Sequence, residues 1–584
     1  DFPCSHVGVH WLADGGRGQG EQGKHSVQVE VRGSRDGVRW SGWRRVRVEA
    51  HGPDRESASS GRETFGALVG GHLATWLQYR LTFAEAGPEP PWVERVTLTY
   101  LDSRAPPGAE TSPRGFSSLV ARAGLGAFLE RVITREEWGA DESIRFIDGK
   151  DQWPRAFVSP KLLVVHHTAG DNEYADPAAE VRAIYTYHTV TEGFGDIGYQ
   201  LLIDNRGQAY EGRLGREVDP DGGPGREILS RDVVAGHVFG YNYGSVGIAL
   251  LGTFIEAEPT ESALQTLEEA LAFEAARHHL GPASQIDFLR SRKRSGDDDL
   301  WRDGLNAVSG HRDCLATECP GDRLYARLRE LRGGVAARLG SPGPEVRIVR
   351  GPEDRDTWPG DLVFGWEGDS ALEFSARLEG WRLSEEPDLI VPLSGYTEDE
   401  RELWGPWSPQ RGVSFALPPD ARGHYTLHVR ARGAGGREGL YAARWPLFVD
   451  RHTLADNADP RRTIRSGAWR RSSDVLGFNG SDYEQAEPAG APASFVWSLS
   501  VPEGGTYRVL ACWTEGDFRA SDAHFTVSLG SRQIAEARVD QRGRGGAWVE
   551  LARVPLSADA ECRVELTNDA DGVVVADAIR VVML

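Results

Sequence analysis

Long hydrophobic runs are missing from this 584-residue sequence. Its longest, such as Leu162–Val165 and Ile248–Leu251, are far shorter than the roughly 20 apolar residues that a membrane-spanning helix needs. Basic residues are also in deficit, because 66 Lys and Arg face 87 Asp and Glu, which gives a net charge of -21. A nucleic-acid surface needs a basic patch to neutralise phosphates. We therefore expect no membrane span and no nucleic-acid partner, and neutral or sugar-like partners fit better.

Cysteine is scarce, with five residues in the chain: Cys4, Cys314, Cys319, Cys512 and Cys562. Because the number is odd, at least one of them cannot be in an intramolecular disulfide, and one could be a metal ligand. Cys512 and Cys562 lie on separate predicted strands and could pair in an exported protein. The sequence begins at Asp1 without a methionine, which is typical of a processed chain. We expect a secreted or cell-envelope protein whose signal peptide is already absent.

The length exceeds what one hydrophobic core usually organises, so several domains are expected. Alternating strand patterns and turn signals predict β-sandwiches at both ends and strands mixed with helices in the centre. The fold class is therefore multidomain, with a central mixed α/β domain whose sheet is flanked by helices. The predicted boundaries are a β-sandwich at 1–102, a linker at 103–130, the α/β domain at 131–340, an Ig-like sandwich at 343–450 and a β domain at 464–584.

Three helices are predicted in the central domain. One begins with Asp176 as N-cap and Pro177 at its first position. A second carries Leu264, Leu267 and Leu271 on one stripe, and a third follows Pro320 with Leu324, Leu328 and Leu331 facing inward. The charged stretch 284–306 is expected to be a surface loop or a lid.

Two histidines end the apolar strand KLLVVHHT at 161–168. Because neighbouring strand residues point to opposite faces, only one of His166 and His167 can face a given pocket, and periodicity does not choose between them. Further along the chain, His311 and Cys319 lie eight residues apart in GHRDCLATECPGD at 310–322. A helix starting at Pro320 would favour a thiolate at Cys319. Two imidazoles and one thiolate would leave a fourth zinc position for water, although a buried thiol or a disulfide explains Cys319 equally simply.

Five segments occur in one order: ITREEWGA (133–140), VVHHTAG (164–170), DIGYQLLIDNRGQAYEGR (196–213), AGHVFGYNYGSVGIALLG (235–252) and GHRDCLATECPGD. In these segments the chain resembles the amidase-2 family of zinc amidases, which includes the peptidoglycan-recognition proteins. The resemblance covers roughly 131–340 and implies an N-acetylmuramoyl-L-alanine amidase that acts on peptidoglycan. The stretch 214–234 departs from it as an insertion in the region that sorts stem peptides in relatives.

The resemblance also assigns the site. It implies one zinc ion held by His166, His311 and Cys319, with Tyr199 and Thr317 as catalytic residues. His237, Asn242 and His167 become candidate substrate contacts, although a packing role or a hydrogen bond to a metal ligand is an equal alternative for His237. The alternative function is a receptor that binds peptidoglycan without cutting it. In such relatives the zinc cysteine is typically replaced, whereas Cys319 is present here.

Flanking segments carry a second resemblance. The segments GFNGSDYEQA (477–486) and TNDADGVVVADAIRVV (567–582) are similar to the golvesin and xanthan-lyase type of carbohydrate-binding-like domain. Near the other end, Trp40 and Trp43 could stack on a sugar ring, but packing within the sandwich is the commoner role of such tryptophans. Nothing in the sequence specifies the oligomeric state, and we expect a monomer.

Overall fold

The structure is a computed structural model that describes residues 4–584 with internal gaps. The ranges outside the described residues are 15–26, 49–62, 84–91, 105–125, 130, 214, 218–225, 228–231, 292–300, 353–355, 358–359, 369–370, 384–389, 393–403, 418–422, 450, 476–477, 480–481 and 489–490. Most of the predicted linker 103–130 and most of the insertion 214–234 therefore lie outside the described residues. Within the described ranges, every helix is too short or too polar to cross a bilayer.

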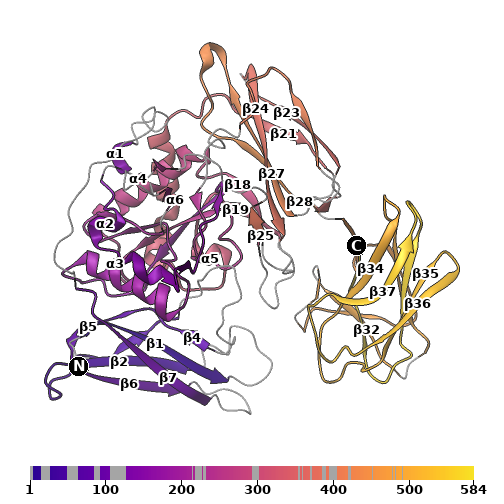
Figure 1. The fold of residues 1–584 in the computed structure, drawn as a ribbon, viewed down its shortest axis with the longest axis horizontal. Helices are drawn as coiled ribbons and strands as arrows, with labels where there is room; N and C mark the ends of the chain where they lie inside the picture. Colours follow the sequence, from indigo (N-terminus) through magenta and orange to yellow (C-terminus); the bar gives the residue numbers. More distant parts are fainter. Residues whose placement is uncertain are drawn as a thin grey trace.

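The described residues among the first hundred form two sheets around one core (Figure 1). We call this unit the N-terminal sheet pair. In one sheet β1 pairs with β4, β5 and β7, and in the other the order is β3-β2-β6. Alternate residues of β1 and β2, such as Val7, Val9, Val29 and Val31, fill the space between them. The strands are β1 (Cys4–Asp14), β2 (Val27–Ser34), β3 (Arg44–Val46), β4 (Glu63–Phe65), β5 (Val69–Ala74), β6 (Trp76–Phe83) and β7 (Trp92–Leu101).

The two tryptophans considered for sugar stacking lie beside arginines. The guanidinium of Arg32 lies 5.1 Å from the ring centroid of Trp40 and 4.5 Å from that of Trp43. Arg80 lies 4.6 Å from the Trp43 ring. Both indoles are half-buried. These contacts favour the packing role, since cations already lie against the rings.

The central domain is a five-stranded sheet in the order β13-β12-β17-β11-β20. Strand β11 pairs in parallel with β17 and β20, and all six of its residues are buried. Helices α4 and α6 pack on one face of the sheet through Leu264, Leu267 and Leu328. The sheet strands are β11 (Leu162–His167), β12 (Leu201–Ile203), β13 (Ala209–Glu211), β17 (Ser245–Leu250) and β20 (Val308–Gly310).

The predicted helices are present, with one correction. Helix α3 (Pro177–Thr186) begins after Asp176, whose carboxylate accepts a hydrogen bond from the Ala179 N–H at 3.2 Å. Helix α4 spans Glu261–Arg277. The third helix, α6, spans Asp322–Leu339 rather than starting at Pro320, because Gly321 takes the N-cap position with a φ of 88°. The other helical segments are α1 (Gly126–Leu129), α2 (Arg135–Trp138), η3 (Glu142–Arg145), η4 (Tyr187–Thr191, a π-helix) and α5 (His311–Cys314).

The charged stretch 284–306 is not simply a loop. Its two ends pair as antiparallel strands β18 (Gln285–Leu289) and β19 (Trp301–Asn306), and Phe288 and Leu305 are buried. Its middle, 292–300, lies outside the described residues. The remaining short strands of this domain are β8 (Phe146–Ile147), β9 (Lys150–Asp151), β10 (Phe157–Val158), β14 (Arg216–Glu217), β15 (Arg226–Glu227) and β16 (Asp232–Val233).

Two further sheet-rich regions follow the central domain (Figure 1). In the first, a three-stranded sheet, β21-β23-β26, and a five-stranded sheet, β22-β28-β27-β24-β25, share one core. The strands are β21 (Arg347–Arg350), β22 (Asp356–Thr357), β23 (Asp361–Glu367), β24 (Glu373–Leu383), β25 (Ile390–Pro392), β26 (Gly412–Ala416), β27 (Gly423–Arg432) and β28 (Ala443–Val449), with a short helix η6 (Ala434–Gly436).

The last region contains sheets in the orders β29-β40-β34-β37, β30-β33-β38-β35-β36 and β31-β32-β39. Cys512 lies on β34 and Cys562 on β38, and all five cysteines are free thiols, so the pairing that was possible for an exported protein is not formed. The strands are β29 (His452–Asp456), β30 (Thr463–Ser466), β31 (Arg470–Ser472), β32 (Tyr483–Ala486), β33 (Ser494–Leu499), β34 (Gly505–Cys512), β35 (Ala523–Leu529), β36 (Arg532–Val539), β37 (Val549–Leu556), β38 (Cys562–Thr567), β39 (Val574–Ala576) and β40 (Ala578–Met583).

Replacing Leu267 by alanine tests the packing of α4 on the sheet. Leu267 is fully buried, so Leu267→Ala removes apolar contacts and leaves a cavity, and we expect it to lower the free energy of unfolding by about 2–5 kcal/mol. Urea unfolding followed by tryptophan fluorescence measures the loss. The matched control is Leu372→Ala, at a leucine that is 58% exposed. Equal effects of the two substitutions would contradict this account of the core.

Candidate metal centre

The alternation of side chains along β11 determines which of the two histidines faces the candidate site. Leu163 and Val165 pack against the helices, whereas Leu162 and Val164 belong to a cluster on the other face. His166 continues the second set and is fully buried. Its register partner on β17 is Ala249, whose small side chain leaves room on that face.

His311 and Cys319 reach the same place from the neighbouring strand. Strand β20 runs parallel to β11 and ends at Gly310, so His311 directly follows the carboxyl end of a strand beside His166. The ring centroids of His166 and His311 are 4.7 Å apart. Cys319 lies in the turn before α6, with its Sγ 3.6 Å from Nδ1 of His166. These three residues therefore come together, although 153 positions separate His166 from Cys319.

The donor atoms of His166, His311 and Cys319 lie within 4.8 Å of one another. For a tetrahedral ion with bonds of about 2.0–2.3 Å, nitrogen and sulfur ligands lie roughly 3.6 Å apart. The separation of Cys319 Sγ from His166 Nδ1 matches that value. The sulfur also accepts the N–H of His167 at 3.4 Å and lies 3.8 Å from the carbonyl oxygen of the same residue. The helix start predicted at Pro320 does not support a thiolate directly, because α6 begins at Asp322.

His237 lies behind His166 rather than in an open groove. Its Nδ1 is 3.0 Å from Nε2 of His166, and its Nε2 is 3.2 Å from the hydroxyl of Ser245. The ring packs on Gly247, where a Cβ would lie 2.4 Å from the His237 Cγ. A hydrogen bond to the second ring nitrogen of a ligand histidine fixes its orientation and tautomer. The sequence offered no signal for Ser245, because its role depends on the fold of β17 against the 235–243 turn.

Asn242 holds that turn. Its side-chain oxygen accepts the backbone N–H groups of His237 and Val238 at 2.9 and 3.0 Å. His167 points to the opposite face of β11 from His166, and its Nδ1 accepts the N–H of Phe254 at 3.3 Å. The direct substrate contacts predicted for His237, Asn242 and His167 stay predictions, since their described partners are groups of the protein.

The two predicted catalytic residues border the metal cluster. The ring of Tyr199 lies 5.4 Å from that of His166 and 5.8 Å from that of His188. Thr317 is half-buried, and its hydroxyl oxygen accepts the N–H of Cys319 at 3.2 Å, which leaves the hydroxyl proton available to donate. The catalytic roles of both stay predictions.

Another buried group, Asp232, Glu274 and His278, also has donor atoms close enough to share a cation. Arg277 contacts both carboxylates, and its distance to Glu274 is 2.6 Å. The guanidinium therefore already compensates the two negative charges. Proximity of the Arg277 charge is also one reason why the pKa of Asp232 is lowered, against the opposing effect of burial.

Comparison with known proteins agrees with the two resemblances. Residues 156–322 match the family model described as N-acetylmuramoyl-L-alanine amidase, and residues 453–583 match the Golvesin C-terminal domain. The chain therefore carries an amidase-type domain and a golvesin-type domain, as the sequence motifs predicted.

Named relatives fall into two groups. The N-acetylmuramoyl-L-alanine amidase of Homo sapiens is 31% identical over 172 residues, which are 29% of this chain and 23% of that protein. Peptidoglycan recognition protein 1 of Bos taurus is 28% identical over 217 residues, 36% of this chain and 90% of that protein. The solved structure of wild-type Drosophila PGRP-LB is 24% identical, with a TM-score of 0.24 over 34% of this chain and 92% of that one.

Removing the imidazole behind His166 should weaken the metal site. We expect His237→Ala to lower zinc affinity by about 10–100-fold, because His166 loses the hydrogen bond that orients its ring. Competition with a chromophoric chelator measures the affinity. The control is His452→Ala, a buried histidine on β29 of the last region. Unchanged affinity in His237→Ala would reject the positioning role.

Proposed function

We propose that this protein is a zinc-dependent N-acetylmuramoyl-L-alanine amidase. It would hydrolyse the amide bond between the lactyl group of N-acetylmuramic acid and the first alanine of the peptidoglycan stem peptide. The observation that carries the proposal is the convergence of His166, His311 and Cys319 next to Tyr199 in a domain that matches amidases. Two imidazoles and one thiolate are the donor set of a catalytic zinc site, with one position open.

The residues of the site have separable tasks. When bound, the zinc ion would lower the pKa of its bound water towards about 7 and polarise the scissile carbonyl. His166, His311 and Cys319 would hold that ion, and His237 would keep the His166 ring in place. The phenol of Tyr199 would donate a hydrogen bond to the oxyanion that develops on the carbonyl oxygen. Thr317 would donate its hydroxyl proton to the nucleophile or to the same intermediate.

Other parts of the chain would place the enzyme on its substrate. We propose β-sandwiches at 1–102 and 464–584 that bind cell-wall or other glycans, and an Ig-like spacer at 343–450. The proposed partner is peptidoglycan, the proposed location is secreted or in the cell envelope, and the proposed state is a monomer. The presence of Cys319 favours this enzyme over a receptor that only binds peptidoglycan.

The ligand Cys319 and its neighbour Cys314 make a matched pair of variants. We expect Cys319→Ala to lose stoichiometric zinc and the release of stem peptides from purified sacculi, because one of three ligands is gone. Cys314 is also buried, and burial raises the pKa of its thiol well above the usual range, so it remains neutral. Cys314→Ala should therefore keep zinc and activity. Metal analysis and chromatography of released peptides measure both effects.

Two results would count against the proposal. Full activity in Cys319→Ala would reject the assigned metal site. A parent protein that holds stoichiometric zinc and binds sacculi without releasing peptides would reject the amidase and support the receptor.

The phenol of Tyr199 can be tested without disturbing the metal. We expect Tyr199→Phe to lower kcat by about 10²–10³, as the loss of one oxyanion donor typically does, with zinc content unchanged. Tyr185→Phe is the control, since Tyr185 belongs to the same core and donates its hydroxyl to the Asp141 carbonyl at 2.9 Å instead. Steady-state kinetics on a soluble muropeptide give the comparison. Equal kcat in the two variants would remove Tyr199 from the mechanism.

A further inference from the structure

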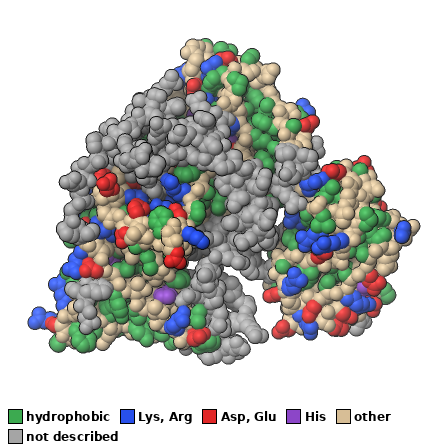
Figure 2. Space-filling model, in the orientation of Figure 1, with side chains coloured by type: hydrophobic (Ala, Val, Ile, Leu, Met, Phe, Trp, Pro, Cys, Tyr) green, Lys and Arg blue, Asp and Glu red, His purple; other side chains and the backbone are tan. Residues whose placement is uncertain are grey.

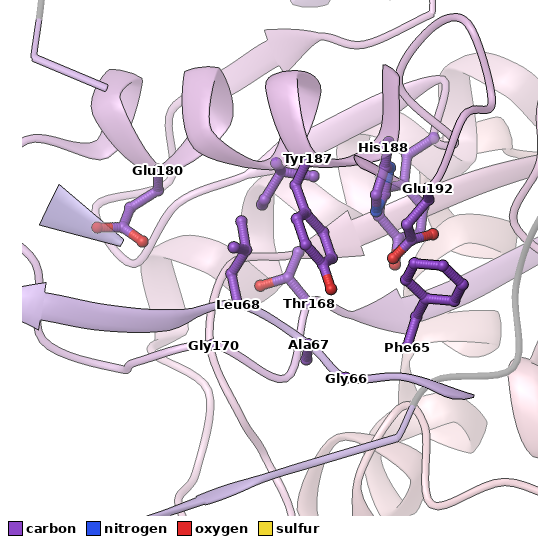
Figure 3. Close-up of a pocket in the computed structure, with 12 residues that line it drawn as sticks. Phe65, Gly66, Ala67, Leu68, Thr168, Gly170, Glu180, Tyr187, His188 and Glu192 are labelled. Carbon is purple, nitrogen blue, oxygen red and sulfur yellow. The ribbon is translucent and has the colours of Figure 1, made fainter. Parts of the chain in front are cut away.

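A small cavity of about 30 Å³ lies beside Tyr199. Figure 3 shows residues that line this cavity. One side is the central domain, which contributes Thr168 after β11 and the ring of Tyr187 from η4. The other side is the N-terminal sheet pair, which contributes the consecutive residues Phe65–Leu68, from the last residue of β4 to the residue before β5. In Figure 3 the Tyr187 ring points from its helix towards this segment. The space next to the predicted catalytic phenol is therefore shared by two parts of the chain.

Polar contacts hold the N-terminal sheet pair against the central domain. Arg44 contacts Asp171 at 2.6 Å, in the loop that follows the His166 strand. Arg47 contacts Glu318 at 3.1 Å, the residue directly before the Cys319 ligand. His6 lies 2.9 Å from Glu180 on α3. These contacts join the sheet pair to both of the chain segments that carry metal ligands.

Apolar side chains and two glycines allow the N-terminal sheet pair to lie close against the central domain. Leu68 is buried in one cluster with Ile184, Tyr187 and Tyr199. Gly8 on β1 faces Tyr187 so closely that a Cβ would lie 2.1 Å from the ring, and a Cβ at Gly70 would lie 2.2 Å from Asp171. The N-terminal sheet pair and the central domain are therefore closely packed against each other at this interface.

We infer that the N-terminal sheet pair forms one wall of the substrate site and that Phe65–Leu68 is a specificity-determining segment. This inference rests on the proposed amidase function. The segment presents the Phe65 ring, the Leu68 side chain and backbone groups beside the predicted catalytic Tyr199. It belongs to the reaction site, in addition to any role of the sheet pair in glycan binding.

The chemistry of the cavity indicates the glycan side of the substrate. Its walls are aromatic and aliphatic groups with the hydroxyls of Thr168 and Tyr187, a combination that suits a sugar ring or its acetamido group. Among the described residues that line it there is no Lys or Arg, the side chains that would attract the carboxylates of a stem peptide. The volume admits one small group, so the wall would contact the edge of the sugar next to the scissile amide.

Two substrates that share a scissile amide can show whether the segment Phe65–Leu68 contacts the glycan or the peptide. One is a disaccharide-peptide, and the other is a lactyl-peptide of the same stem without sugar rings. For the zinc-loaded full chain we expect Phe65→Ala to raise KM for the disaccharide-peptide roughly tenfold, the size of effect that a lost apolar contact in a pocket has. kcat should stay within about twofold, and kinetics on the lactyl-peptide should not change. Calorimetric binding of the disaccharide-peptide in the Tyr199→Phe background, in which turnover is slow, should show the same loss of affinity.

Control variants keep the result interpretable. Tyr79→Ala removes an exposed aromatic from β6, in the other sheet of the same unit, and should leave both substrates unaffected. Ala67→Val keeps Phe65 but adds two methyl groups to the wall, and it should also raise KM for the disaccharide-peptide. Thermal unfolding of each variant verifies that the fold is retained, and Ala67→Val stands in for Phe65→Ala if that variant does not fold.

The outcomes distinguish this inference from the proposed function. If the parent cuts both substrates and the Phe65→Ala and Ala67→Val variants cut them as well as the parent does, the inference that Phe65–Leu68 forms a wall of the substrate site is rejected. The proposed amidase function then still stands. Equal losses on the two substrates reject the glycan assignment, because the contact would then be with the peptide side. A zinc-loaded parent that neither binds nor cuts muropeptides rejects the proposed function, and the wall with it.

Discussion

Parallel pairing of β11 with β17 and β20 is the constraint on which the site depends. It sets His166 at the carboxyl end of one strand and His311 directly after the end of the next, so two imidazoles meet without any long side chain having to reach. The alternation of side chains along β11 then separates two tasks. One face is packed by α4 and α6, and the other carries the ligand. The helices therefore stabilise the strand from the side that the chemistry does not use.

Behind the metal ligands, buried polar side chains form a hydrogen-bonded network. Ser245 contacts His237, His237 contacts His166, and Asn242 holds the turn that carries His237. Buried polar groups are costly unless they are paired, so this chain of contacts resists rearrangement of the His166 ring. A second polar interface joins the central domain to the next region, where Lys161 donates to the Thr426 hydroxyl at 3.0 Å and burial lowers the lysine pKa to about 8.

Local signals predicted local structure well. The Asp176 and Pro177 pair located the start of α3, and the leucine stripes identified α4 and α6, because both depend on spacing within a few turns. The start of α6 was displaced by Gly321, whose φ lies in a region that glycine favours. The ordered motifs predicted the amidase and golvesin matches and grouped His166, His311 and Cys319. Spacing alone could not have chosen His166 over His167, since that choice needs the face on which the helices pack.

Contacts between segments that are distant in the chain could not be predicted from local sequence patterns. The pairing of β18 with β19 was hidden by their charged residues, and the sequence did not show that Cys512 and Cys562 are both free thiols. The approach of Phe65–Leu68 to Tyr199 joins two domains across more than a hundred residues. Gly8 and Gly70 shape that approach to Tyr187 and Asp171. The N-terminal sheet pair is therefore shaped to fit this particular domain, and we expect that a homologous unit taken from another protein would not fit the same surface.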